Sequence, residues 1–216
     1  MEIKIKNSWD EITWREYEQI EQILNADIPE DYKTVHLVSI LTGCDTSVIE
    51  NIPISQFTKL TPYLSFLYTE PDTHTHKFEY IINGHEYRFA GKLDEITTAQ
   101  YIDYRTYMQD EDKDIIKLMS VFIIPKDHDY NDGYDMEQVK SDIGDMCWLD
   151  VRACAFFLRL WLAAFILLMK SSLVKSMKKT KSDKKRIEEL EESLNNTAYY
   201  LLSAEYANLH SLHSIL

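Results

Sequence analysis

The sequence predicts a mainly α fold with a small antiparallel β-sheet, an α+β class, and three observations carry this prediction. The chain has 216 residues, of which 45% are hydrophobic, so it can bury a core in one or two domains. Only five Gly and five Pro are present, which argues against a sandwich or barrel with many tight turns. Helix-capping patterns recur along the chain, whereas one segment alone has a clear hairpin pattern.

The residue pattern of the N-terminal part predicts a strand followed by helices. Residues 1–7 alternate between apolar and charged side chains, which is typical of a short strand. Thr13 and Glu16 have the spacing of a capping box, in which each side chain satisfies an amide at a helix start. Helices are expected over residues 13–26, 30–41, 46–51 and 55–67.

The segment Phe78–Phe89 is the clearest β signal. Two runs of alternating apolar and polar residues flank Asn83-Gly84, and both turn residues tolerate a positive φ. An isolated hairpin is only marginally stable, so we expect the strand at residues 1–7 to pair with it.

An internal repeat relates two halves of the N-terminal region. Asp10-Glu11-Ile12-Thr13 recurs as Asp94-Glu95-Ile96-Thr97, an offset of 84 residues, and the second copy keeps a capping box with Gln100. Leu37-Val38-Ser39-Ile40 corresponds to Leu118-Met119-Ser120-Val121 at an offset of 81. We therefore predict duplicated strand-helix-helix halves.

The repeat sets the predicted domain organisation. Residues 1–146 form an acidic α+β body whose halves cover about 1–70 and 78–146, the second ending in a polar loop and a short helix from Met136 to Ile143. Residues 147–216 form a helical C-terminal region. It contains the apolar segment 148–177, a basic connector over 178–186, and an amphipathic helix over 187–216.

The apolar segment 148–177 has two possible environments. A membrane span needs about 20 largely apolar residues. Arg159 interrupts this segment, and its longest uncharged run is only Leu160–Met169, so burial against protein is favoured over membrane insertion. The candidate interaction residues are apolar side chains of this segment and of the final helix: Trp148, Phe156, Phe157, Leu160, Trp161, Phe165, Leu190, Leu194, Tyr199 and Tyr200.

The net charge of −13 is unevenly distributed. The window Lys170–Arg186 holds eight basic residues and one acidic residue, so it carries +7 and the rest of the chain carries −20. An acidic body repels nucleic acid, so any DNA contact would have to use Lys170–Arg186. Four glutamates follow within six residues, a pattern that favours an exposed helix with internal ion pairs.

Catalytic and metal-binding motifs are missing from the sequence. No nucleophile elbow, phosphate-binding loop or zinc-protease motif is present, so we expect no enzyme, no cofactor and no small-molecule substrate. Asp127, Asp129 and Asn131 resemble the start of a calcium loop, but the required Gly and Glu are absent from positions six and twelve. Three sparse cysteines without a CxxC pattern indicate reduced thiols and synthesis in a cytoplasm.

The segments Trp9–Tyr17 and Lys92–Tyr104 resemble a group of small acidic proteins encoded among the structural genes of tailed bacteriophages, particularly crAss-like phages. Ser39–Gly43 and Leu64–Leu67 also resemble segments of tail-assembly proteins of phages. The resemblance covers about residues 8–124 and rests on helix caps and core positions, so it assigns no functional residue. It implies a virion or virion-assembly protein, located at the portal or tail or carried as cargo.

The sequence therefore predicts a non-enzymatic virion protein, structural or internal cargo, that is made in the host cytoplasm. We expect several copies, bound to portal, tail or capsid proteins through the apolar segment and the final helix. Two alternatives remain open. One is a tail-assembly chaperone that leaves before the particle matures, and the other is a membrane-associated protein anchored through 148–177.

Overall fold

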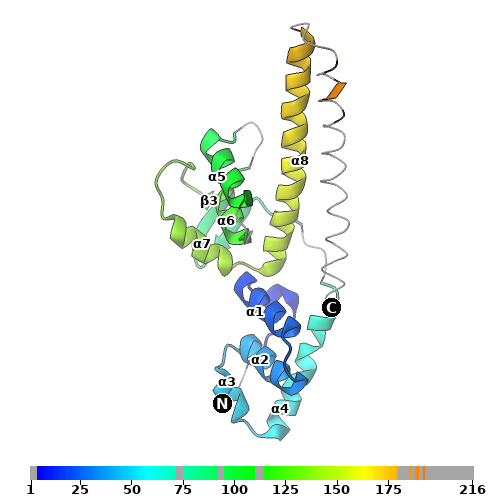
Figure 1. The fold of residues 1–216 in the computed structure, drawn as a ribbon. Helices are drawn as coiled ribbons and strands as arrows, with labels where there is room; N and C mark the ends of the chain where they lie inside the picture. Colours follow the sequence, from blue (N-terminus) through cyan, green and yellow to red (C-terminus); the bar gives the residue numbers. More distant parts are fainter. Residues whose placement is uncertain are drawn as a thin grey trace. The chain divides into compact units, whose positions relative to one another are not determined.

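The computed structural model describes residues 4–71, 75–91, 95–109 and 114–179, together with Lys185, Glu188, Glu189 and Glu192. The chain divides into two compact units, Met1–Cys154 and Ala155–Leu216. The fold is mainly helical with a three-stranded antiparallel sheet (Figure 1), so the predicted α+β class is confirmed.

In the first half of the first unit, all regular elements that the structure describes are helices. Its elements are the 3-10 helix η1 (Trp9–Glu11), α1 (Trp14–Asn25), α2 (Glu30–Thr42), α3 (Thr46–Glu50), α4 (Ile54–Leu60) and the 3-10 helix η2 (Thr61–Tyr68). The single helix predicted over 55–67 is thus two pieces, because Pro62 has no amide hydrogen to continue the α-helical bonding. Ile12, Ile20, Leu37, Leu41 and Leu67 form the centre of its apolar core.

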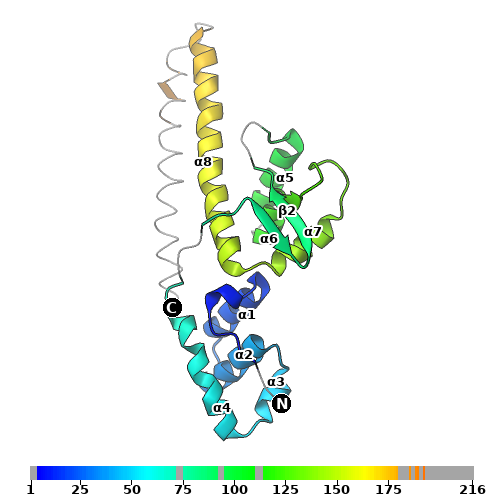
Figure 2. The same cartoon turned by 180° about the vertical axis from the view of Figure 1, so that it is seen from behind.

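The second half builds the sheet. It contains β1 (Glu79–Ile82), β2 (His85–Phe89), α5 (Thr98–Gln109), α6 (Ile115–Ser120), β3 (Ile123–Pro125) and α7 (Met136–Gly144). The strand order is β1-β2-β3, and both pairs are antiparallel. Helices α6 and α7 pack against each other and against β3 (Figure 2), so the sheet has one covered face.

The third strand is not the one that the sequence suggested. Residues 4–7 form no strand, and Met1–Ile3 lie outside the described residues. The Lys6 amide donates to the Leu41 carbonyl (3.0 Å), and Ile5 packs against the helical core. Ile123–Pro125 pairs with β2 instead, as the edge strand opposite β1, and Ile123 and Ile124 are both buried there.

The repeat extends to equivalent hydrogen bonds. Thr13 and Thr97 both form the predicted capping box, with Glu16 and with Gln100 respectively. The Ala90 amide donates to the Phe122 carbonyl (2.6 Å). This bond corresponds to the Lys6–Leu41 bond at the same offsets of 84 and 81 residues, so in both halves the segment before the first helix is tied to the end of the second.

Helix α8 (Trp148–Lys179) is one continuous helix of 32 residues. Its first turns belong to the first unit, where Trp148, Leu149, Val151 and Cys154 are buried. The division between units therefore falls after Cys154, two turns beyond the boundary expected after Met146. Among the helices that the structure describes, none is both long and apolar enough to cross a bilayer. Most of the predicted connector and final helix lies outside the described residues.

Candidate functional site

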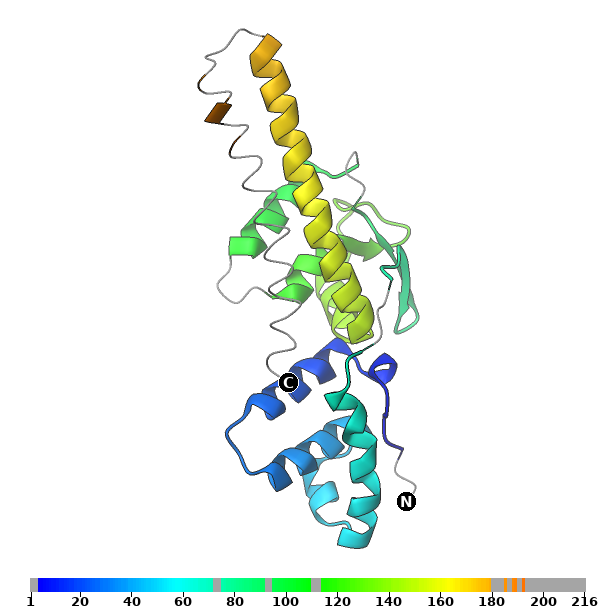
Figure 3. The same ribbon diagram turned by 90° about the vertical axis from the view of Figure 1, so that its right-hand side faces the viewer.

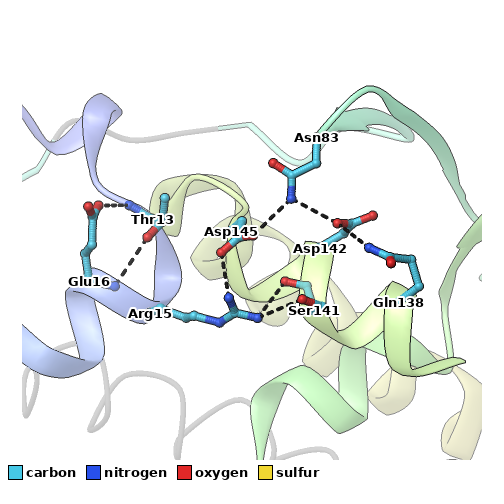
Figure 4. Close-up of polar contacts among 8 residues, drawn as sticks. All are labelled: Thr13, Arg15, Glu16, Asn83, Gln138, Ser141, Asp142 and Asp145. Atoms are coloured by element: carbon cyan, nitrogen blue, oxygen red, sulfur yellow. Dashed lines mark hydrogen bonds and ion pairs between the residues drawn. The ribbon is translucent and has the colours of Figure 1, made fainter. Parts of the chain in front are cut away.

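The tip of the β1–β2 hairpin contacts the C-terminal end of α7. Asn83 and Gly84 have φ angles of 52° and 83°, so they form the type I′ turn that the Asn-Gly pair predicts. This turn directs the Asn83 amide toward α7, where its Nδ2 lies 2.9 Å from a carboxylate oxygen of Asp142 and 2.9 Å from one of Asp145 (Figure 4). The turn residue thus anchors the hairpin to α7.

Asp142 is the centre of this polar cluster. It is fully buried, and its carboxylate lies within hydrogen-bond distance of four side chains. Tyr87 Oη donates at 2.5 Å, His85 Nδ1 lies at 2.7 Å, and Gln138 Nε2 donates at 3.0 Å, in addition to Asn83. Every carboxylate lone pair therefore has a partner, which is the condition for burying a charge.

The electrostatics of Asp142 follow from these contacts. Burial by itself raises the pKa of the Asp142 carboxyl, but hydrogen bonds from Tyr87, Asn83, His85 and Gln138 outweigh it, so the pKa lies below the usual range. Burial and the hydrogen bond to Asp142 raise the pKa of Tyr87. At neutral pH the pair is an ionised carboxylate and a neutral phenol, an arrangement that anchors the hairpin rather than one that exchanges protons.

A second contact joins α1 to the same end of α7. Arg15 donates from Nη1 to Asp145 (2.9 Å) and from Nη2 to the carbonyl and hydroxyl oxygens of Ser141 (2.9 and 3.1 Å), as Figure 4 shows. A Cβ on Gly144 would lie 2.6 Å from Arg15 Nε, so a larger residue there would require the Arg15 side chain to move. Arg15 and Asn83 share Asp145, and the two halves are thereby linked.

A cavity of about 430 Å³ lies beside this cluster. The strand residues Glu79–Ile82 form one wall, and Met146, Cys147 and Asp150 from the turn into α8 form another. Lys77 also lines it and pairs with Asp150 at 2.7 Å. Burial raises the pKa of the Cys147 thiol, so this cysteine is not an activated nucleophile.

The ten candidate interaction residues lie in three different settings. Trp148 is 5% exposed and stacks on Tyr17 at a ring distance of 4.4 Å, so it is a core residue of the first unit. Phe156 is 43% exposed on α8, and Phe157 is half-buried. Leu160, Trp161 and Phe165 lie in α8, where the structure describes their backbone and not their side chains. Leu190, Leu194, Tyr199 and Tyr200 lie outside the described residues.

The acidic loop after β3 is held by the protein itself. The Asp129 carboxylate accepts a hydrogen bond from Arg88 (3.0 Å), and the Asp129 amide donates to Asp132 (2.6 Å). Over the ranges that the structure describes, no three His, Cys, Asp or Glu side chains are placed to hold a metal ion.

The His85–Asp142 pair has the geometry of an acid–base pair, but its surroundings differ from those of a catalytic site. Among the described side chains, no Ser, Thr or Cys hydrogen-bonds His85, so nothing there would be activated as a nucleophile. The sequence motifs did not reveal this cluster. Its one signal is Asp142 itself, a charge between Val139 and Ile143 on the apolar stripe of α7.

Comparisons of the chain with protein families, with curated proteins and with solved structures found no match.

Proposed function

We propose that this chain is a structural or internal cargo protein of a bacteriophage virion and acts through protein–protein contacts, without catalysing a reaction. The resemblance of residues 8–124 to virion-assembly proteins supports the virion assignment. The saturated hydrogen bonding of Asp142 supports a structural role for the cluster that most resembles acid–base machinery.

The observation that carries the proposal is the apolar surface of α8. Phe156, Leu168 and Leu173 are 43%, 59% and 50% exposed. They are spread along about 25 Å of helix, at 1.5 Å per residue, and at 3.6 residues per turn they lie about 100° to 140° apart around its axis, so partners would have to cover α8 from more than one side. Removing apolar surface from water contributes about 25 cal/mol per Å², so covering these side chains with a partner stabilises an assembly.

The charge distribution supports a protein partner. Residues 1–154 hold 30 acidic and 14 basic side chains, a net charge of −16, whereas residues 155–216 hold six acidic and nine basic side chains, a net charge of +3. The acidic first unit disfavours contact with DNA, and Lys170–Arg186 is the one segment suited to phosphate. Oppositely charged regions on one chain favour multi-copy contact or docking to charged virion proteins.

Mass spectrometry of purified particles tests the virion assignment, since a virion protein is retained through purification at a fixed copy number. A tail-assembly chaperone, the first alternative, is present in infected cells and absent from particles. Membrane association through 148–177, the second alternative, predicts that the chain sediments with lipid vesicles. Absence from particles together with vesicle binding would overturn the proposal in favour of the membrane-associated alternative.

Substitutions on α8 test the contact surface. Phe156→Asp, Leu168→Asp and Leu173→Asp each replace an exposed apolar side chain with a charge, and we expect at least a tenfold loss of incorporation into particles. Ser172→Asp is the matched control, because it adds the same charge to an exposed position of the same helix without removing apolar surface. Equal incorporation of all four variants would refute a role for this surface.

A further inference from the structure

Among the residues that the structure describes, none pairs with the outer edge of strand β1. It is the first strand in the order β1-β2-β3, and it contacts β2 on one side only. In an antiparallel pair, hydrogen-bonded and non-hydrogen-bonded residue pairs alternate along the strands. The two-residue turn makes Ile82 and His85 a hydrogen-bonded pair, and the bond from the Phe89 amide to the Phe78 carbonyl (2.8 Å) marks another such pair four residues away. The backbone groups of Glu79 and Ile81 therefore point away from β2, where no described group bonds them.

The cavity described above lies along this edge. Four consecutive residues of β1 line it, so its long direction follows the strand. Ile81 is 77% exposed, and β1 contains neither a proline nor a bulge that would discourage pairing. Four residues of β-strand span about 13 Å, and this edge offers two outward amides and two outward carbonyls to an added strand.

The chemistry of the lining selects the kind of strand that fits. Three carboxylates, of Glu79, Asp145 and Asp150, line the cavity, while Tyr80, Ile82 and Met146 supply apolar surface. Lys77 pairs with Asp150 and Arg15 with Asp145, whereas the Glu79 side chain is 69% exposed and lies 3.6 Å from Lys126, so Glu79 is the carboxylate most open to a further basic partner. An extended segment that alternates apolar and charged side chains, with a basic residue opposite Glu79, complements both features. Residues 1–6 of this chain, Met-Glu-Ile-Lys-Ile-Lys, alternate in this way, with Lys4 and Lys6 basic and Glu2 acidic.

We propose that residues 1–4 of a second copy add to β1 as a fourth antiparallel strand. With Lys4 opposite Glu79, Glu2 lies opposite Ile81, and the outward backbone groups of β1 are bonded. The same register places Ile3 opposite Tyr80, on the face that β1 turns toward the core, because side chains alternate along a strand. The inference rests on the proposed function as an assembling protein and names one of its contacts.

The occupant is a second copy because the segment's own anchor is elsewhere in the unit. Lys6 is held by the Leu41 carbonyl at the end of α2 and by Glu16 of α1 (2.6 Å). Residues 1–5 reach at most about 18 Å from that anchor. Helix α2 and the hairpin lie on opposite sides of α1 within the first unit (Figure 3). Lys4 is exposed on its own copy, so it is available to another.

Disulfide trapping between two full-length chains tests the contact directly. A Lys4→Cys chain is mixed with a differently tagged Glu79→Cys chain, and peptide mapping identifies the bonds formed. We expect a disulfide between positions 4 and 79 that joins the two tags. Two outcomes would overturn the proposal. One is a 4–79 disulfide that forms only within a single chain carrying both Lys4→Cys and Glu79→Cys, and the other is no disulfide between these positions.

Charge exchange supplies a second readout, the dimer dissociation constant from analytical ultracentrifugation. Lys4→Glu and Glu79→Lys are each expected to weaken association about three- to tenfold, and the double variant is expected to restore it. Ile81→Pro removes the outward amide and weakens association by about tenfold, whereas the control Ile81→Thr keeps the amide. A double variant no tighter than the single variants would contradict the register.

The Phe156→Asp chain separates this proposal from the proposed function. If the α8 surface and the β1 edge are different contacts, Phe156→Asp in the two cysteine chains leaves the 4–79 disulfide intact and still lowers incorporation into particles at least tenfold. If the wild-type chain is found in particles but the Lys4→Cys and Glu79→Cys chains form no 4–79 disulfide, the strand addition is refuted and the virion role stands.

Discussion

The two halves of the first unit use the same capping geometry in different environments. In the first half, Glu16 completes the capping box and forms an ion pair with Lys6, and its side chain is 23% exposed. In the second half the equivalent residue is Gln100, which is 2% exposed and donates to the carbonyls of Ala90 and Val121 (3.1 Å each). Ala90 is the equivalent of Lys6 at the offset of 84 residues.

This difference shows how a repeated element adapts to burial. The backbone role at the helix start is the same in both halves, but the second half has an amide, where the site is sealed, at the position of the carboxylate in the first. An amide can donate to two carbonyl oxygens, whereas a carboxylate facing them would be repelled and desolvated. The second half also buries Asp142 and partly buries His76, so we expect it to be more sensitive to substitution and to acid.

The largest effect is expected at Asp142. Asp142→Asn removes the charge and turns an amide toward groups that donate, so we expect the free energy of unfolding to fall by about 3 kcal/mol. Asp145→Asn is the matched control on the same helix, and its side chain is 35% exposed, so a loss below about 1 kcal/mol is expected. Urea denaturation measures both losses. Equal losses would show that Asp142 contributes no more to stability than Asp145 does.

Exchanging the capping residues between halves tests the comparison itself. Gln100→Glu should cost about 2 kcal/mol of unfolding free energy at pH 7, because a buried carboxylate would face two carbonyl oxygens. Glu16→Gln should cost less than about 1 kcal/mol, since it loses only a partly exposed ion pair. Thermal unfolding in the same buffer distinguishes the two variants. A larger loss for Glu16→Gln would contradict the conclusion that the capping residue of the second half is the more buried of the two.

Acidification should affect the second half through His76. Burial lowers the pKa of this imidazole to about 4 from an unfolded value of 6.5, with Asp150 as a smaller opposing influence. The unfolded chain binds the proton more tightly, so stability is complete above pH 6.5 and is lost as the pH falls toward 4. Because the ring is half-buried, we expect a discounted loss of about 1 to 2 kcal/mol.

Urea titrations at pH 7, 5.5 and 4.5 measure this slope. His76→Phe removes the titrating group and keeps an aromatic ring beside Phe78 and Phe89, so the variant should lose most of the dependence between pH 6.5 and 4.5. An unchanged slope in the variant would assign the acid sensitivity to other groups. Asp142 adds a further loss at lower pH, because its folded pKa lies below the unfolded value.

The smallest effects are expected at the two helix caps. Thr13→Ala and Thr97→Ala each remove one capping hydrogen bond, and each should cost about 1 kcal/mol. Thr→Ser at the same positions keeps the hydroxyl and serves as the control. Similar losses would support an equivalent role of the two caps. A loss at one position alone would show that the two caps contribute unequally to stability.

The sequence predicted those parts of the fold that depend on neighbours along the chain. Thr13, Thr97 and Asn83-Gly84 act within four residues, so their capping boxes and turn could be read directly. The third strand could not, because the pairing of Ile123–Pro125 with β2 joins segments far apart in the sequence and no local pattern predicts it. The alternation over residues 1–7 predicted a strand there, but the Lys6 amide bonds the Leu41 carbonyl instead.

The candidate site divides in the same way. The aromatic and apolar character of Trp148 was visible in the sequence, but its stacking on Tyr17, 131 positions earlier, was not. The cluster at Asp142 joins residues 55 to 59 positions apart, and no local pattern connects them.

By itself the sequence determined the α+β class, the helix starts, the hairpin turn, the internal repeat and the separation of acidic from basic regions. These depend on local hydrogen bonds, side-chain periodicity and charge count, which need no knowledge of distant neighbours. The tertiary structure decided which carboxylate is buried, which strand completes the sheet and which edge stays open. Those outcomes depend on desolvation and packing, and both are set only when distant segments come into contact.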